Sequence, residues 1–271
     1  MLFYKKVAVP KVLSIYVMAL AGAAMVHPGV VHAQKETATL SAQQRSAMEA
    51  VIRDYLLKNP AIIRDAMMAL QAKDALQREA STRQALQKHR IELLNDVDSP
   101  VGGNPHGDIT VVEFFDYNCG YCKRASGGLK ELAARDPNVR IVYKEFPILS
   151  QESTTAAKAA LAARRHGKYE EFHYGLMAAE KTDDAAIQTL ATKLGLDYSS
   201  LNKDMADQKW DAQLARNRQL ANALGINGTP AFIIGDSLIP GAVDAEKLIS
   251  LVNAERARLS SAQHRKTRQT K

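Results

Sequence analysis

The only two cysteines of the 271-residue chain stand close together, in the sequence Cys119-Gly120-Tyr121-Cys122. The preceding run, Ile109 to Tyr117, has the composition of a buried strand, and the following run, Lys123 to Ala134, has the spacing of a helix. The free N–H groups and the dipole of a helix N-terminus stabilise an anion, and the thiolate is the reactive form of cysteine. We therefore predict a redox pair, in which Cys119 is the nucleophile and Cys122 resolves the mixed disulfide.

The short spacing of the cysteines also bears on two other roles for them, a structural disulfide and a metal site. A disulfide across two residues closes almost no loop, so it restrains the unfolded chain very little. Two thiolates can instead supply half of a zinc site or hold Cu(I), which prefers sulfur ligands. Five candidate histidine partners have no paired ligand spacing: His89, His106, His166, His173 and His264. We expect no metal site, although Cu(I) binding by the cysteine pair remains an alternative, as does a non-catalytic scaffold.

Glu113 is the one ionisable residue among Val111, Val112, Phe114 and Phe115. It shares a strand face with Val111 and Phe115, and a central parallel strand is covered on both faces. We therefore predict that Glu113 is buried, that burial raises its pKa, and that it exchanges a proton with Cys122. An exposed edge strand is the alternative, and Lys144 from the neighbouring strand is a possible partner if the register allows it.

The first 33 residues differ in composition from the rest of the chain. Lys5, Lys6 and Lys11 form a basic segment, Val12 to Val26 is apolar, and Val31-His32-Ala33 ends in a small residue. This order is typical of a signal peptide, and the apolar run is short for a membrane span. We predict cleavage after Ala33 and export to an oxidising compartment, with an uncleaved anchor as the alternative.

The net charge of +7 is concentrated at the chain ends. The segment Glu255 to Lys271 holds six lysines and arginines and one acid, which predicts a basic tail over 259–271. We expect this tail to be solvated and frayed. Contact with anionic lipid or nucleic acid is the alternative, but export argues against nucleic acid as a partner.

Residues 34–98 are predicted to be a helical oligomerisation or stalk region. Ser41 and Gln44 have the spacing of a capping box before a helix from Ala42 to Lys58. A second helix is expected from Ala61 to Asp98, because this segment contains neither glycine nor proline. An apolar stripe over residues 40–75 needs a partner surface, so we predict a homo-oligomer. Folding of both helices back onto the rest of the chain is the alternative.

Glycine and proline gather in residues 99–107, which predicts a linker. From 108 to 258 the pattern indicates strand, helix and strand, a helical block over about 151–224, and then two strands and a helix from Asp244 to Leu259. This order predicts an α/β domain with a thioredoxin-like fold and an all-helical insertion, preceded by the helical N-terminal extension.

Over residues 108–258 the sequence resembles the DsbA family of bacterial exported thiol-disulfide oxidoreductases. The segment Val51 to Gln71 is similar to the N-terminal extension of ScsC-type members, which mediates oligomerisation. The resemblance implies a periplasmic protein thiol-disulfide oxidoreductase without a cofactor. It also implies cysteine-containing exported proteins as substrates, a membrane-bound redox partner, and a buried acid at Glu113, six residues before the first cysteine.

Thr229-Pro230 matches the cis-proline motif that thioredoxin-like proteins place opposite their cysteines. A cis bond turns the preceding backbone so that its N–H and C=O can pair with a substrate strand. We therefore expect Gly120, Tyr121, Thr229 and Pro230 to contact substrate. A trans proline that begins an edge strand is the alternative.

Gly120-Tyr121 differs from the Pro-His dipeptide of the strongly oxidising family members. An imidazolium beside the thiolate would stabilise the reduced form, whereas Tyr121 offers no charge. We expect a less oxidising disulfide and therefore isomerase or reductase activity. Net dithiol oxidation is the alternative.

Overall fold

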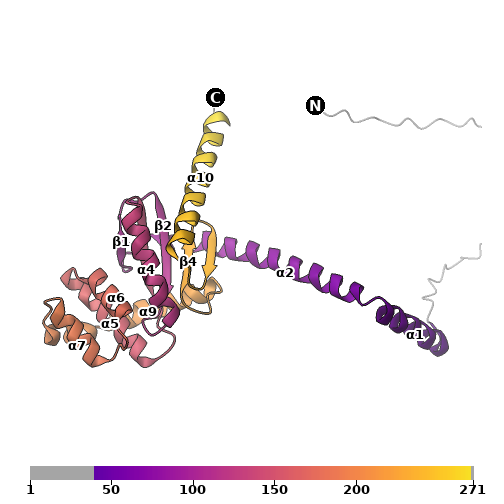
Figure 1. Ribbon diagram of the computed structural model, residues 1–271, viewed down its shortest axis with the longest axis horizontal. Coiled ribbons are helices and arrows are strands. Elements are labelled where there is room, and N and C mark those ends of the chain that lie inside the picture. The colour runs from indigo at the N-terminus through magenta and orange to yellow at the C-terminus, as the bar shows by residue number, and fades with distance from the viewer. Residues whose placement is uncertain (1–39, 270–271) are drawn as a thin grey trace, which may run out of the picture. The chain divides into compact units, whose positions relative to one another are not determined.

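The computed structural model describes residues 40–269 (Figure 1). It divides into two compact units, one that ends at Ile63 and one that begins at Arg64, and each is described by itself. The predicted signal peptide lies outside the described residues. Within the described part, no helix combines the length and the apolar character that a membrane span requires.

The first unit contains α1, Ala42–Lys58, and the beginning of α2. The capping box at the start of α1 is confirmed, because Ser41 Oγ accepts from Gln44 N and Gln44 Oε1 accepts from Ser41 N. Helix α1 has no buried residue. Its large apolar side chains are exposed, among them Val51 at 68%, Ile52 at 53% and Tyr55 at 57%. The apolar stripe is therefore without a partner surface in the described single chain.

The second unit holds the remaining elements. Its helices are the rest of α2 (Ala61–Lys88), α3 (Arg90–Leu94), α4 (Gly120–Arg135), α5 (Gln151–Ala163), a 3-10 turn (Arg164–His166), α6 (Tyr169–Ala178), α7 (Asp184–Lys193), α8 (Tyr198–Met205), α9 (Lys209–Ala223) and α10 (Ala245–Gln269). Its strands are β1 (Val101–Gly103), β2 (Ile109–Phe115), β3 (Val139–Glu145), β4 (Ala231–Ile234) and β5 (Ser237–Pro240).

The five strands form one mixed sheet in the order β1-β3-β2-β4-β5. Strands β2 and β3 are parallel and joined through α4, whereas β1, β4 and β5 pair with their neighbours antiparallel. Strand β2 is therefore central, as the apolar run before the cysteines predicts. The predicted α/β thioredoxin-like order, with helices α5 to α9 inserted between β3 and β4, is confirmed.

Both faces of β2 are covered, because its residues alternate between two cores. Val111 and Phe115 lie in the core formed with α4, α10 and the inserted helices. Val112 and Phe114 lie in a second core, which includes side chains of α3 and α9. Because side chains alternate between the two faces of a strand, Glu113 lies on the same face of β2 as Val111 and Phe115. This face is covered by the helix that carries the cysteines.

The single helix expected from Ala61 to Asp98 is interrupted. Helix α2 ends at Lys88, His89 leaves the helical conformation with φ −99° and ψ 19°, and α3 begins at Arg90. The break allows Leu86 and Leu93, both buried, to enter the second core of the sheet. Tertiary burial thus overrides the helix propensity of this segment, and its C-terminal end belongs to the domain rather than to a stalk.

We expect Leu93→Ala to lower the free energy of unfolding by about 2 to 5 kcal/mol, because Leu93 is only 2% exposed and its removal leaves a cavity. Ile91→Ala on the same short helix is the control, since Ile91 is 75% exposed and should change stability by at most about 0.5 kcal/mol. Urea unfolding of both variants measures the difference. Equal effects would contradict the packing of α3 on the sheet.

The segment 99–107, which we expected to be a linker, contributes strand β1. Val101, Gly102 and Gly103 pair antiparallel with β3 and extend the sheet by one edge strand. Glycine is required at position 102, because a Cβ there would lie 2.8 Å from the Tyr143 ring. The glycines that suggested flexibility instead allow a close approach between the edge strand and the sheet.

The C-terminal tail also differs from the expectation of a frayed end. Helix α10 continues to Gln269, and Figure 1 shows it extending past the sheet. The segment contains neither glycine nor proline, so helix propensity is sufficient to continue it. The side chains of Arg265 and Arg268 are exposed, as expected for a solvated basic segment.

Candidate active site

The first cysteine caps the helix that follows it. Cys119 occupies the N-cap position of α4 in an extended conformation, and its carbonyl accepts from Lys123 N at 3.0 Å. Its thiol is 7% exposed and donates to the Thr229 carbonyl oxygen at 3.2 Å. The first cysteine therefore lies at the N-terminus of α4 and contacts the loop that precedes β4, as predicted.

The second cysteine lies beneath the first. Cys122 is fully buried, and both thiols are free. Burial raises the pKa of the Cys122 thiol, and the nearby Glu113 carboxylate raises it further, while hydrogen bonds from the Asp116 backbone and Thr229 act in the opposite direction. Cys122 is therefore held as a thiol until a base removes its proton.

Glu113 is fully buried, as predicted. Neither of its carboxyl oxygens has a hydrogen-bond partner among the described residues. Loss of solvation raises the pKa of Glu113 from 4.5 to about 8. The carboxyl is thus poised to give or take a proton near neutral pH beside the buried thiol.

The raised pKa of Glu113 predicts a pH-dependent stability. The carboxyl ionises near 4.5 in the unfolded chain and near 8 in the folded chain, so the folded state binds more protons between these values. The contribution of this carboxyl to the free energy of unfolding is fully present below pH 4.5 and is lost as the pH rises toward 8. Above pH 8 the free energy of unfolding no longer depends on this group. We expect a loss of roughly 3 to 5 kcal/mol across this window.

Thermal or urea unfolding of the reduced chain at several pH values measures this loss. Subtracting the profile of Glu113→Gln isolates the contribution of this carboxyl from those of other buried groups. Glu49→Gln, a change at an exposed residue of α1, is the control and should leave the pH profile unchanged. Parallel profiles for the wild-type chain and Glu113→Gln would contradict the assignment.

Lys144 does not pair with Glu113, which corrects the partner considered from the sequence. The register places Glu113 opposite Tyr143 and Phe114 opposite Lys144, so the lysine side chain lies on the other face of the sheet. There its amine donates to the Glu92 carbonyl at 2.7 Å and to Asp96 Oδ2 at 2.8 Å. Lys144 therefore holds α3 and the turn after it, and Glu113 has no cationic partner within residues 40–269.

A groove of about 720 Å³ runs beside the cysteines. Four of the predicted site residues lie at or near it: Tyr121, Thr229 and Pro230 line it, and Gly120 directly precedes Tyr121. The Thr229-Pro230 peptide bond is cis, as predicted. The structure thus brings together all seven residues proposed from the sequence: Glu113, Cys119, Gly120, Tyr121, Cys122, Thr229 and Pro230.

Asp116 holds the turn between β2 and the cysteines, a role that the sequence analysis missed. Its carboxylate accepts from Asn118 N at 2.7 Å, Ile148 N at 2.8 Å and Leu149 N at 3.0 Å. Its carbonyl accepts from Cys119 N at 3.0 Å. A buried aspartate at the end of an apolar strand was the available signal, by the same logic that identified Glu113.

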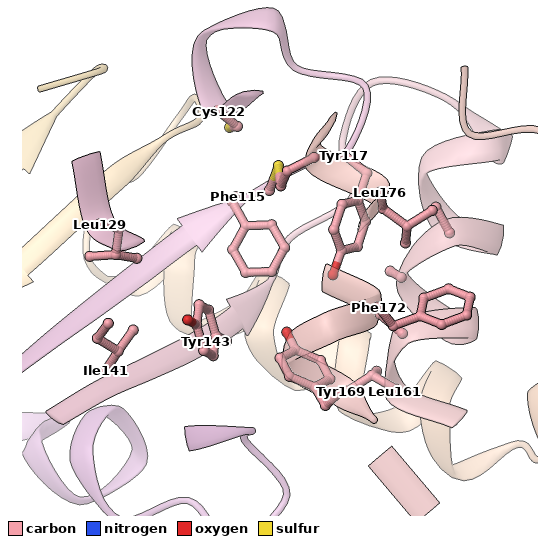
Figure 2. Packing of buried hydrophobic residues seen from close by; sticks show 14 of the residues in the cluster. Phe115, Tyr117, Cys122, Leu129, Ile141, Tyr143, Leu161, Tyr169, Phe172 and Leu176 are labelled. Atoms are coloured by element: carbon pink, nitrogen blue, oxygen red, sulfur yellow. The ribbon is translucent and has the colours of Figure 1, made fainter. Parts of the chain in front are cut away.

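A second buried polar group lies next to this turn and was also missed. Tyr117 and Tyr169 donate to Glu145 Oε1 at 2.9 and 2.8 Å, and their hydroxyl groups point toward one another in Figure 2. The Tyr117 hydroxyl also lies 3.1 Å from Nδ1 of His173. Burial raises the pKa of Glu145 and lowers that of His173 to about 3. This cluster ties the inserted helices to the strand ends beside Cys119.

No group of three or more histidine, cysteine, aspartate or glutamate side chains gathers as a metal site within residues 40–269. Three of the five histidines considered from the sequence contact other side chains. His89 contacts Glu92, His166 contacts Asp204, and His173 lies among aromatic rings. The structure therefore does not join them to the two cysteines.

Family models match two parts of the chain. Residues 110–253 match the DSBA-like thioredoxin domain, and residues 44–77 match the copper resistance protein ScsC N-terminal domain. The second match covers most of α1 and the first part of α2, where the resemblance to ScsC-type extensions was predicted.

Solved structures agree with both matches. A thioredoxin-like oxidoreductase from Silicibacter pomeroyi is 47% identical, covers 62% of this chain and 98% of its own, and has a TM-score of 0.60. ScsC of Proteus mirabilis in a transitional conformation is 33% identical, covers 82% of this chain and 99% of its own, and also has a TM-score of 0.60. A periplasmic thioredoxin-like protein from Salmonella enterica serovar Typhimurium is 35% identical over 62% of this chain and 95% of its own, with a TM-score of 0.58.

Curated relatives that the chain matches include much longer proteins, bacterial Na⁺/H⁺ antiporters named NhaA. The first, from Salinispora tropica, is 29% identical over 168 residues, and the match spans 60% of this chain but only 26% of the antiporter. From its domain match, its cysteine geometry and its similarity to ScsC, the chain belongs to the DSBA-like thioredoxin domain family and has the fold of DsbA- and ScsC-type thiol-disulfide oxidoreductases.

Proposed function

We propose that the protein is a periplasmic thiol-disulfide oxidoreductase that acts on exported proteins, with isomerase or reductase activity ahead of net oxidation. One observation carries the proposal. Cys119 occupies the N-cap position of α4 and donates to the Thr229 carbonyl beside an open groove, while Cys122 is buried behind it next to Glu113. A partly accessible thiol beside the groove and a fully buried thiol beneath it are what a two-step exchange requires.

In the first step, the Cys119 thiolate attacks one sulfur of a substrate disulfide. A mixed disulfide forms, and the other substrate sulfur leaves as a thiolate. An isomerase cycle ends when another substrate thiolate attacks the mixed disulfide and regenerates the Cys119 thiolate. A reductase cycle ends when Cys122 attacks Cys119 Sγ, which releases the reduced substrate and leaves the Cys119–Cys122 disulfide.

Glu113 supports the reductase step as a proton acceptor. The Cys122 thiol must lose its proton to attack, and burial disfavours the free thiolate. A carboxylate with a pKa of about 8 accepts that proton without a solvent-exposed intermediate. The same carboxyl returns the proton when the pair is reduced again.

Reactivation of scrambled ribonuclease, which contains several wrong disulfides, tests the function. We expect the purified chain to restore activity in the presence of a small thiol reductant. Rapid oxidation of a reduced substrate, without reactivation of the scrambled ribonuclease, would favour net dithiol oxidation over isomerase or reductase activity. Failure of both reactions would remove the proposal.

Export to the periplasm is supported by the signal-peptide pattern of residues 1–33 and by the description of a similar Salmonella protein as periplasmic. In that compartment the substrates are exported proteins that contain cysteine. A reductase cycle leaves the Cys119–Cys122 disulfide, so we propose a membrane-bound redox partner that reduces the cysteine pair again. Amino-terminal sequencing of the exported chain tests cleavage after Ala33.

We also propose that the N-terminal helices assemble several copies of the chain. The exposed apolar side chains of α1 and the match of residues 44–77 to the ScsC N-terminal domain support this assembly. Several active sites facing one misfolded substrate would raise the effective concentration of thiols around it.

The combined change Ile52→Lys with Tyr55→Lys should disrupt the assembly, because it places charges on the apolar face of α1. We expect light scattering to give the mass of one chain for this variant and a multiple of that mass for the wild-type chain. Arg53→Gln, on the same helix, should keep the wild-type mass. A wild-type chain that is already monomeric would contradict the proposal.

Cu(I) binding is a second candidate, favoured by the copper resistance protein whose N-terminal domain matches this chain. The two adjacent thiols suit a soft cation. Competition with a colorimetric Cu(I) chelator, using Cys119→Ser with Cys122→Ser as the control, tests this candidate. No competition by the reduced wild-type chain would exclude it.

A further inference from the structure

The groove beside the cysteines carries a single formal charge. Arg124 is the only described lining residue that is charged at neutral pH, and no acid lines the groove. Most other lining residues are apolar or glycine, including Ile226, Leu238 and Pro240. A substrate segment in this groove therefore meets one cation against a largely apolar surface.

The Arg124 guanidinium lies close to the reactive cysteine. A Cβ atom placed on Gly120, the residue after Cys119, would be 3.8 Å from Arg124 Nη1. The guanidinium carbon also lies 4.3 Å from the centre of the Tyr121 ring. The cation thus lies over Tyr121 and close to Gly120, the two residues between the cysteines.

Arg124 is available to an incoming carboxylate. Its side chain is exposed, and it forms no ion pair within residues 40–269. By contrast, Arg135 of the same helix pairs with Glu131 and Glu246. Stacking on Tyr121 holds the guanidinium plane while its N–H donors remain able to bind a carboxylate through two hydrogen bonds.

We propose that Arg124 selects protein substrates that carry an aspartate or glutamate next to the reacting cysteine. The inference rests on the proposed thiol-disulfide exchange and specifies its substrate class. A substrate strand paired near Thr229 would place the residues flanking its cysteine over the groove. An acidic neighbour then meets Arg124, whereas a lysine at that position is repelled.

Exchange with three matched peptide disulfides tests the inference on the full chain. The peptides differ only in the residue beside the cysteine, which is glutamate, glutamine or lysine. We expect the glutamate peptide to react about two- to fivefold faster than the glutamine peptide and the lysine peptide to react slower by a similar factor, as for an exposed charge pair. High salt should bring these ratios close to one, which a purely steric contact would not do.

Three variants separate the role of Arg124 from general effects. The ratio of the glutamate and glutamine rates is measured within each variant, so that changes in overall reactivity cancel. Arg124→Gln should reduce the ratio to about one, and Arg124→Lys should keep part of it. Lys130→Gln removes an exposed cation of α4 that does not line the groove, and it should retain the wild-type ratio.

Two results would overturn the inference in distinguishable ways. Equal glutamate-to-glutamine ratios in the wild-type chain and Arg124→Gln would remove the selectivity while leaving thiol-disulfide exchange intact. Absence of reaction with all three peptides would remove the exchange activity itself, and the selectivity with it.

Discussion

Replacing Cys119 with serine is expected to abolish disulfide exchange, whereas replacing Cys122 with serine is expected to trap a mixed disulfide. Cys119 is the thiol at the helix N-terminus beside the groove, whereas Cys122 is fully buried, so the loss of Cys119 removes the attacking thiol. We expect a fall of at least about a thousandfold in the exchange rate for Cys119→Ser, because a serine hydroxyl is a weak nucleophile without a base.

Cys122→Ser keeps the attacking thiol but lacks the thiol that resolves the product. Non-reducing electrophoresis should show a covalent adduct between the chain and a substrate peptide, which disappears on reduction. The double variant Cys119→Ser with Cys122→Ser is the control and should form no adduct. An adduct in Cys119→Ser but not in Cys122→Ser would reverse the two roles.

Glu113→Gln is expected to slow the second step of the reaction, the attack of Cys122 on the mixed disulfide. The buried carboxyl is the group beside Cys122 with a pKa near neutrality, and general bases contribute a factor of about 10² to 10⁴. Stopped-flow measurement of substrate release should show a fall of about a hundredfold, with accumulation of the mixed disulfide.

The pH profile distinguishes proton transfer from a structural effect. Release by the wild-type chain should accelerate as the pH rises through about 8, because Glu113 becomes a carboxylate. Glu113→Gln should lack this inflection, and Glu131→Gln, an exposed change on α4, should retain it. An unchanged inflection in Glu113→Gln would assign it to another group.

The sequence was sufficient to predict most of the site because its signals are local. Two cysteines after an apolar strand place a thiol at a helix N-terminus, and the period of a strand places Glu113 on the face of Val111 and Phe115. Burial of Glu113 and the cis conformation of Thr229-Pro230 are both confirmed. The catalytic roles of these residues remain predictions for the experiments above.

Tertiary structure decided what depends on contacts between distant segments. Helix propensity predicts one long helix after Pro60, but burial of Leu86 and Leu93 against the sheet breaks it at His89. Glycines that indicate a linker form β1 because the sheet has an open edge there.

The same distinction applies to the ionisable residues. Burial of an ionisable side chain follows from its place in an apolar strand, which a sequence displays directly. Its partner follows from the strand register and from the helices that cover each face. Lys144 therefore contacts Asp96 instead of Glu113. Arg124 lies close to one helical turn after Tyr121, so both side chains line the groove. Sequence determined which residues could react, and packing determined which of them meet, because hydrophobic periodicity is local while register and coverage are properties of the whole fold.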